Sequence, residues 1–100
     1  MNEDKIKAVI DELVSPGIDA AYSQILNRKT RQEGLAYLEN LRGQDKTIPV
    51  IIGNAHELEF YETGHQSEAE KAIQEYESAM MDGDFQFLQE NIDRLKGMLP

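Results

Sequence analysis

Residues 67–99, SEAEKAIQEYESAMMDGDFQFLQENIDRLKGML, carry the strongest structural signal in this 100-residue chain. Apolar side chains recur there at intervals of three and four residues, which is the period of one face of an α-helix. They form two stripes, the first made of Ala69, Ala72, Ile73, Tyr76, Ala79 and Met80 and the second of Phe85, Leu88, Ile92, Leu95 and Leu99. The break between them contains Gly83, which tolerates a left-handed backbone, and Asp84, which can cap the next helix. So short a break predicts an antiparallel αα-hairpin.

Toward the N-terminus, the same periodicity predicts further helices. One stripe consists of Ile6, Val9, Ile10 and Leu13, and a second of Ile18, Ala21, Tyr22, Ile25 and Leu26. Thr30-Arg31-Gln32-Glu33 is a capping-box pattern, and it precedes a third stripe of Leu35, Leu38 and Leu41. Residues 18–42 form either one helix or two, because this capping signal competes with continuous helical propensity.

The segment 47–66 has two interpretations. Ile48-Pro49-Val50-Ile51-Ile52 is short and β-branched, which favours a strand. A β-hairpin over residues 48–61 would turn Glu57, Glu59 and Tyr61 outward. Alternatively, Asn54 begins a short helix over residues 55–63 that Gly64 ends. We favour the hairpin. The predicted fold is therefore a mainly α single domain over residues 1–100, a bundle of four to five helices ending in an αα-hairpin, with one short β-hairpin near 48–61.

Composition limits the compartment and the class of partner. The chain has no Cys, which removes disulfides, thiolate catalysis and Cys-ligated zinc. The longest nearly apolar run, residues 48–53, is much shorter than the roughly 20 residues that cross a bilayer. The N-terminus shows no apolar signal core. We therefore expect a cytoplasmic protein. A formal net charge of −9 argues against a broad basic face for nucleic acid or an anionic membrane.

The excess negative charge lies in one segment. Residues 57–90 hold ten acidic side chains and one basic one, Lys71, whereas the rest of the chain is neutral overall. This pattern predicts a non-enzymatic interaction module (an adaptor, an inhibitor or a chaperone-like subunit) that engages a basic protein surface. The competing interpretation is a solvated acidic face that keeps a small protein soluble. The candidate partner-binding residues are Glu57, Glu59, Glu70, Glu75, Glu77, Asp82 and Asp84, with Met81, Phe87 and Tyr61 as apolar anchors.

Two other functions were weighed. The acidic segment could mimic nucleic-acid phosphates and inhibit a DNA- or RNA-binding protein, provided that its carboxylates are spaced along an extended face. A divalent metal could be held by His56, His65 and Glu62 and support a metal-dependent activity. The zinc-protease pattern that His56-Glu57 begins requires a second His at position 60, which is Phe. We therefore predict no catalytic residue, no metal ligand set and no cofactor, and we leave homo-oligomerisation open.

Overall fold

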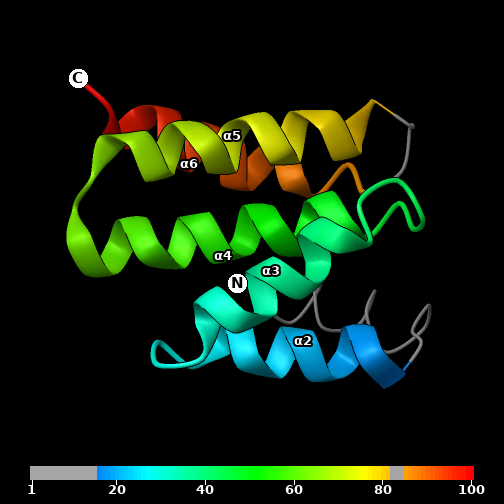
Figure 1. Ribbon diagram of the computed structural model, residues 1–100. Helices are drawn as coiled ribbons and strands as arrows, with labels where there is room; N and C mark the ends of the chain where they lie inside the picture. Colours follow the sequence, from blue (N-terminus) through cyan, green and yellow to red (C-terminus); the bar gives the residue numbers. More distant parts are fainter. Residues whose placement is uncertain (1–15, 82–84) are drawn as a thin grey trace.

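The computed structural model describes residues 16–81 and 85–100, and within them the chain forms five α-helices and no strand. These are α2 (Pro16–Leu26), α3 (Arg31–Asn40), α4 (Ile48–Thr63), α5 (Gln66–Met80) and α6 (Leu88–Met98). Figure 1 shows α4 in the middle of the bundle, with α2 and α3 on one side and α5 and α6 on the other. The predicted mainly α bundle is confirmed. The helix predicted over residues 6–13 and the predicted turn at 82–84 lie outside the described residues.

The segment predicted as a β-hairpin is the central helix α4, so that prediction is wrong. Pro49 stands in the first turn of α4, where its missing N–H has no intrahelical partner to lose. Gly64 ends the helix in a left-handed conformation with a φ of 75°, and its N–H donates to the Phe60 carbonyl. The apolar run is continuous because α4 packs against α5 on one side and against α2 and α3 on the other. A helix that is buried on both sides has the same apolar run as a buried strand.

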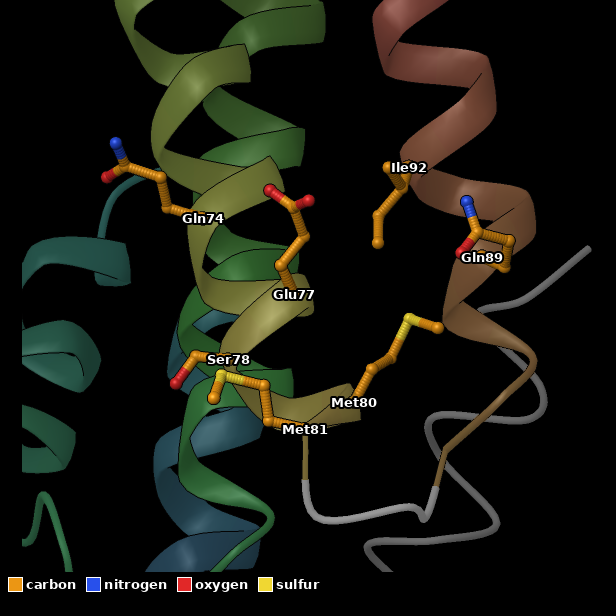
Figure 2. Close-up of a pocket in the computed structure, with 7 residues that line it drawn as sticks. All are labelled: Gln74, Glu77, Ser78, Met80, Met81, Gln89 and Ile92. Carbon is orange, nitrogen blue, oxygen red and sulfur yellow. The ribbon is translucent and has the colours of Figure 1, made fainter.

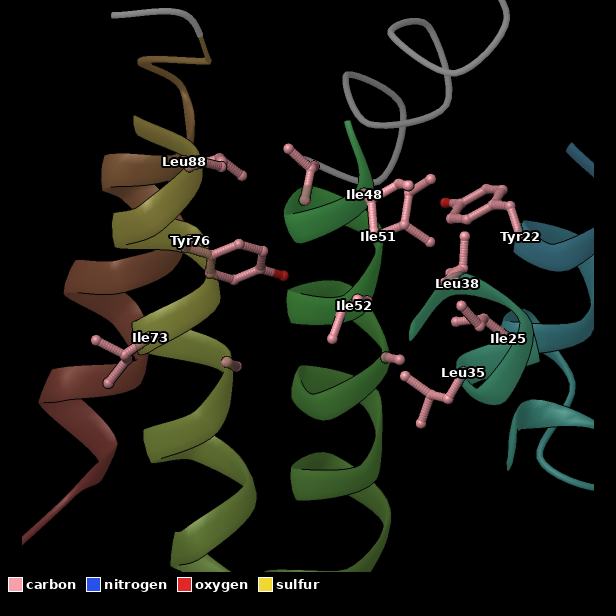
Figure 3. Close-up of a cluster of buried hydrophobic side chains, with 14 of the residues drawn as sticks. Tyr22, Ile25, Leu35, Leu38, Ile48, Ile51, Ile52, Ile73, Tyr76 and Leu88 are labelled. Atoms are coloured by element: carbon pink, nitrogen blue, oxygen red, sulfur yellow. The ribbon is translucent and has the colours of Figure 1, made fainter. Parts of the chain in front are cut away.

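The core lies on both sides of α4. Figure 3 shows Tyr76 and Leu88 on one side of α4, and Tyr22, Ile25 and Leu38 on the other. All five of these side chains are buried. Gly53 lets α5 approach closely, because a Cβ atom at this position would lie 2.7 Å from two ring carbons of Tyr76. The bundle is therefore organised around α4 rather than around the two helices that the sequence signalled most strongly.

Residues 18–42 form two helices, which settles the alternative left open by the sequence. Thr30 precedes α3, but its side chain makes no capping bond to the start of that helix. Its hydroxyl instead donates to the Gln24 carbonyl at 2.8 Å. Arg31, whose side chain is buried, donates from Nε to the Ile25 carbonyl at 2.7 Å. Two carbonyls in the last turn of α2 therefore accept hydrogen bonds from the side chains of Thr30 and Arg31 at the start of α3.

The two C-terminal helices follow the predicted stripes. On α5 the five residues from Ala69 to Ala79 in the first stripe are buried, and Met80 is partly buried. On α6 the buried residues include Leu88, Ile92 and Leu95. The two helices pack against each other, as the αα-hairpin requires.

Candidate interaction surface

Five of the eight acidic side chains that the structure describes in residues 57–90 form ion pairs inside the protein. Arg31 places its Nη1 atom 2.7 Å from Glu59 Oε1 and 2.7 Å from Glu62 Oε2. Arg42, which follows the end of α3, places its Nη2 atom 2.8 Å from a carboxylate oxygen of Glu75. The full set of paired acids in this segment is Glu57, Glu59, Glu62, Glu68 and Glu75. Much of the acidic segment is therefore neutralised by bases from elsewhere in the chain.

Glu57 is buried, so the expectation that it points outward is wrong. Its exposed fraction is 1%, because the helical period of α4 turns residue 57 inward, whereas a strand period would have turned it out. One carboxylate oxygen accepts hydrogen bonds from the Tyr76 hydroxyl at 2.6 Å and the Asn91 amide at 2.8 Å. The other oxygen accepts from the Tyr61 hydroxyl at 2.5 Å and from Arg94 Nη2 at 2.6 Å.

This cluster joins three helices through one carboxylate. Burial alone would raise the pKa of Glu57, but the hydrogen bonds from Tyr61, Tyr76, Arg94 and Asn91 outweigh it and hold the pKa below its ordinary value of 4.5. Burial, together with the bond to Glu57, also raises the pKa of the Tyr61 hydroxyl to about 12. Because the carboxylate is ionised and fully occupied by internal donors, Glu57 belongs to the framework and not to a binding surface.

The other predicted residues divide into paired, covered and exposed groups. Glu59 and Glu75 are mostly covered; Glu59 contacts Arg31 at the start of α3, and Glu75 contacts Arg42, which follows the end of α3. Phe87 was expected to face solvent, but it is partly buried and packs edge-on against Phe85, with ring centroids 6.3 Å apart. Tyr61 is 44% exposed, although its hydroxyl is engaged by Glu57. Asp82 and Asp84 lie outside the described residues.

Three acidic side chains without an ion pair to another described residue and one methionine are exposed on the two C-terminal helices and on the described residue that follows α5. Glu70 and Glu77 on α5 and Glu90 on α6 are exposed, and no ion pair joins any of them to another described residue. Met81, which directly follows α5, is 86% exposed. Residues 70, 77 and 81 are separated by seven and four positions, so they lie along one face of the helix.

An open groove of about 570 Å³ runs beside this face. It is lined by Gln74, Glu77, Ser78, Met80, Met81, Gln89 and Ile92, which come from α5, the residue after it and α6. Figure 2 shows Met80 directed from α5 toward α6 and Ile92 directed from α6 toward α5, whereas Met81 is directed away from α6. Glu77 and Met81 could be predicted from the sequence, but the groove could not be located from it, because it depends on how two separate helices are juxtaposed. The two apolar stripes at helical spacing were the signal that could have indicated it.

The proposed metal ligands are not brought together. His56 lies on α4 and its Nδ1 atom is 2.6 Å from a carboxylate oxygen of Glu68. His65 follows the end of the same helix, so about 12 Å of helical rise separates the two positions. Among the described residues, no group of three His, Asp or Glu side chains is placed to hold a metal ion. The metal-dependent alternative therefore gains no support.

Two further observations concern the other classes of partner. Phosphate mimicry needs an extended row of free carboxylates. Of the acids that the structure describes in residues 57–90, three lack an ion pair with another described residue: Glu70, Glu77 and Glu90. In residues 16–81 and 85–100, no helix has the length and apolar character needed to cross a membrane.

Comparison with known proteins identifies no family. No family model matches the chain, and no curated protein or solved structure gives a significant match.

Proposed function

We propose that this protein is a small interaction module that binds a partner with a basic surface through the exposed face of α5. The residues that would carry the contact are Glu70 and Glu77, with Met81 as an apolar anchor. The observation that supports this proposal most strongly is the division of the acidic residues. The carboxylates that face other helices have internal partners, whereas Glu70 and Glu77 share an exposed face with the most exposed of the large apolar side chains described.

The two kinds of residue have different roles in this proposal. Carboxylates without an internal partner keep their field directed toward solvent, so they attract a basic partner and raise the rate of encounter. An exposed methionine contributes affinity after encounter, because its flexible thioether adapts to the surface that covers it. Charge therefore governs mainly the association rate, and burial of Met81 governs mainly the dissociation rate.

The proposal is tested with a pair of matched charge variants. Glu70→Gln/Glu77→Gln removes both exposed acids of α5 without a large change of volume. Asp19→Asn/Glu33→Gln removes two exposed acids from α2 and α3 and serves as the control, because neither acid has an ion pair among the described residues. Each protein is immobilised and used to capture partners from a lysate of the native host, and the bound proteins are quantified by mass spectrometry.

Two results together would support the proposal. At least one protein should be captured by the wild type and the control but not by the α5 variant. Binding of that purified protein should then be slower with the α5 variant and less sensitive to salt. If the two variants behave alike toward every captured protein, the acidic face of α5 is only a solvated surface.

A further inference from the structure

We infer that the segment of the partner which docks on this surface is an amphipathic, basic α-helix seated in the groove between α5 and α6. This inference rests on the proposed function and adds the chemistry and conformation of the partner. In this arrangement apolar side chains of the partner cover Met80 and Met81, and a Lys or Arg pairs with Glu77.

The lining of the groove specifies the chemistry of its occupant. Met80 and Met81 supply apolar contact area, Ile92 lies at the base of the groove with 2% of its surface exposed, and Gln74, Ser78 and Gln89 are polar but uncharged. Glu77 is the only charged residue in the lining, and it has no ion pair with another described residue. A cationic group placed beside Glu77 therefore has charge complementarity with no competing basic side chain in the groove. Apolar contact on either side of that pair would exclude water and strengthen it.

The shape of the groove favours a macromolecular partner. A volume of about 570 Å³ would suit a small ligand, but the groove is open to solvent along its length and encloses little. Affinity in so open a site requires several side chains presented from one rigid body, because each free side chain would otherwise lose its own rotational freedom on binding.

The backbone of the groove walls favours a helix over an extended peptide. Both walls are α-helices, whose backbone groups bond within each helix, so they offer no strand edge to which an extended segment could add. An extended segment would leave its own backbone groups unpaired where it meets the apolar lining, whereas a helix satisfies them internally. The face from residue 70 to residue 81 has a length of about 16 Å, which matches three turns of a partner helix.

The experiment uses two synthetic probe peptides with identical composition. The first is a peptide of Leu and Lys of about four helical turns, with every Leu on one helical face. The second contains the same residues rearranged so that the Leu side chains surround the helix. Binding of each fluorescein-labelled peptide to the full chain is measured by fluorescence anisotropy at two salt concentrations. Perturbed backbone amides are mapped by two-dimensional ¹H–¹⁵N NMR.

Two matched pairs of variants locate the contact. Met81→Ser removes the exposed apolar side chain beside the groove, and Leu26→Ser removes one from α2, across the bundle, where Leu26 is 51% exposed. Glu77→Gln removes the acid from the groove, and Glu33→Gln removes an exposed acid from α3. We expect Met81→Ser to weaken binding of the first peptide about fivefold or more, and Glu77→Gln to weaken it and flatten its salt dependence. The two control variants should bind like the wild type, and the perturbed amides should lie on α5 and α6.

The outcomes separate this inference from the function on which it rests. Equal binding of the two peptides, with both weakened by Glu70→Gln/Glu77→Gln, would retain the acidic face and overturn the helical groove. Equal effects of Met81→Ser and Leu26→Ser, perturbed amides on α2 and α3, or no binding of either peptide would also overturn it. The lysate capture judges the proposed function independently, because it does not depend on the conformation of the bound segment.

Discussion

Replacing Glu57 by Gln tests whether the buried carboxylate holds α4, α5 and α6 together. The substitution keeps the size of the side chain and removes its charge. The carbonyl oxygen of the new amide can still accept from Tyr76 and Asn91, which are both buried. Its NH₂ group must then face Arg94, a donor that cannot accept a hydrogen bond.

The expected loss follows from these contacts. Removing one partner of a buried ion pair costs about 3–5 kcal/mol. The Arg94 side chain is 35% exposed and can recover part of its hydration, so we expect a smaller loss of about 2–3 kcal/mol. This is a substantial part of the roughly 5–15 kcal/mol by which a small domain is stable. It corresponds to a fall in the melting temperature of roughly 10–20 °C for a chain of this size.

The assay is urea unfolding followed by far-ultraviolet circular dichroism, with thermal unfolding as a second measurement. Glu70→Gln is the matched control, because it makes the same chemical change at an exposed position of α5 and should alter the free energy of unfolding by no more than about 0.5 kcal/mol. The comparison requires equal m-values, so that a shift of the midpoint reports stability alone. If Glu57→Gln unfolds within 0.5 kcal/mol of Glu70→Gln, the carboxylate cluster does not contribute as its geometry indicates.

Three further predictions concern other parts of the chain. Gly53→Ala should destabilise the protein by about 1–3 kcal/mol, because the new Cβ would lie 2.7 Å from the Tyr76 ring. Gly97→Ala is the control, because its Cβ would lie in open space; in the same urea assay it should leave stability unchanged or raise it by up to about 1 kcal/mol. The pKa of Glu57 is lowered in the folded protein, so its stabilising contribution is complete above pH 4.5 and is lost as the pH falls through the folded pKa. The difference in unfolding free energy between wild type and Glu57→Gln should therefore narrow on acidification. A constant difference from pH 7 down to acid unfolding would contradict the lowered pKa. Brief treatment with hydrogen peroxide should oxidise the exposed Met81 before the partly buried Met80. Peptide mass spectrometry gives the order of oxidation, and circular dichroism checks that the protein stays folded. Oxidation of Met80 first would contradict the exposure of the two side chains.

The sequence was most informative where a helix has one buried face. On α5 and α6 the apolar spacing identified the core residues, because the opposite faces are polar and the helical period is visible. On α4 the period is hidden, since Ile48, Val50, Ile51 and Ile52 are all buried against helices on two sides. The β-branched composition then favoured a strand, although Pro49 in a first turn and Gly64 after the last turn are ordinary helix boundaries.

The strand prediction for α4 accounts for the misassignment of Glu57. A strand period places residue 57 outside and a helical period places it inside, so the most deeply buried of the described acids was predicted to lie on the surface. Glu59 and Glu75 were misjudged for a different reason, because their arginine partners are distant in the sequence and become neighbours only in the folded bundle. Glu77 and Met81 were placed on the surface correctly, because each lies off the apolar stripe of a clearly periodic helix.

The uneven distribution of charge along the chain therefore has a structural explanation that comes before any functional one. Glu57 and Glu59 of α4 contact bases from the helices on either side: Arg31 precedes α4 in the sequence, and Arg94 follows α5. Because like-charged segments cannot pair with themselves, this arrangement favours association between different helices and disfavours wrong pairings. Correct pairing of the helices by charge requires only those acids that face a neighbouring helix. Glu70 and Glu77 face none of the described bases, so the requirement for correct packing does not explain them. An unexplained pair of acids beside an apolar groove is the feature that a basic, amphipathic partner would explain.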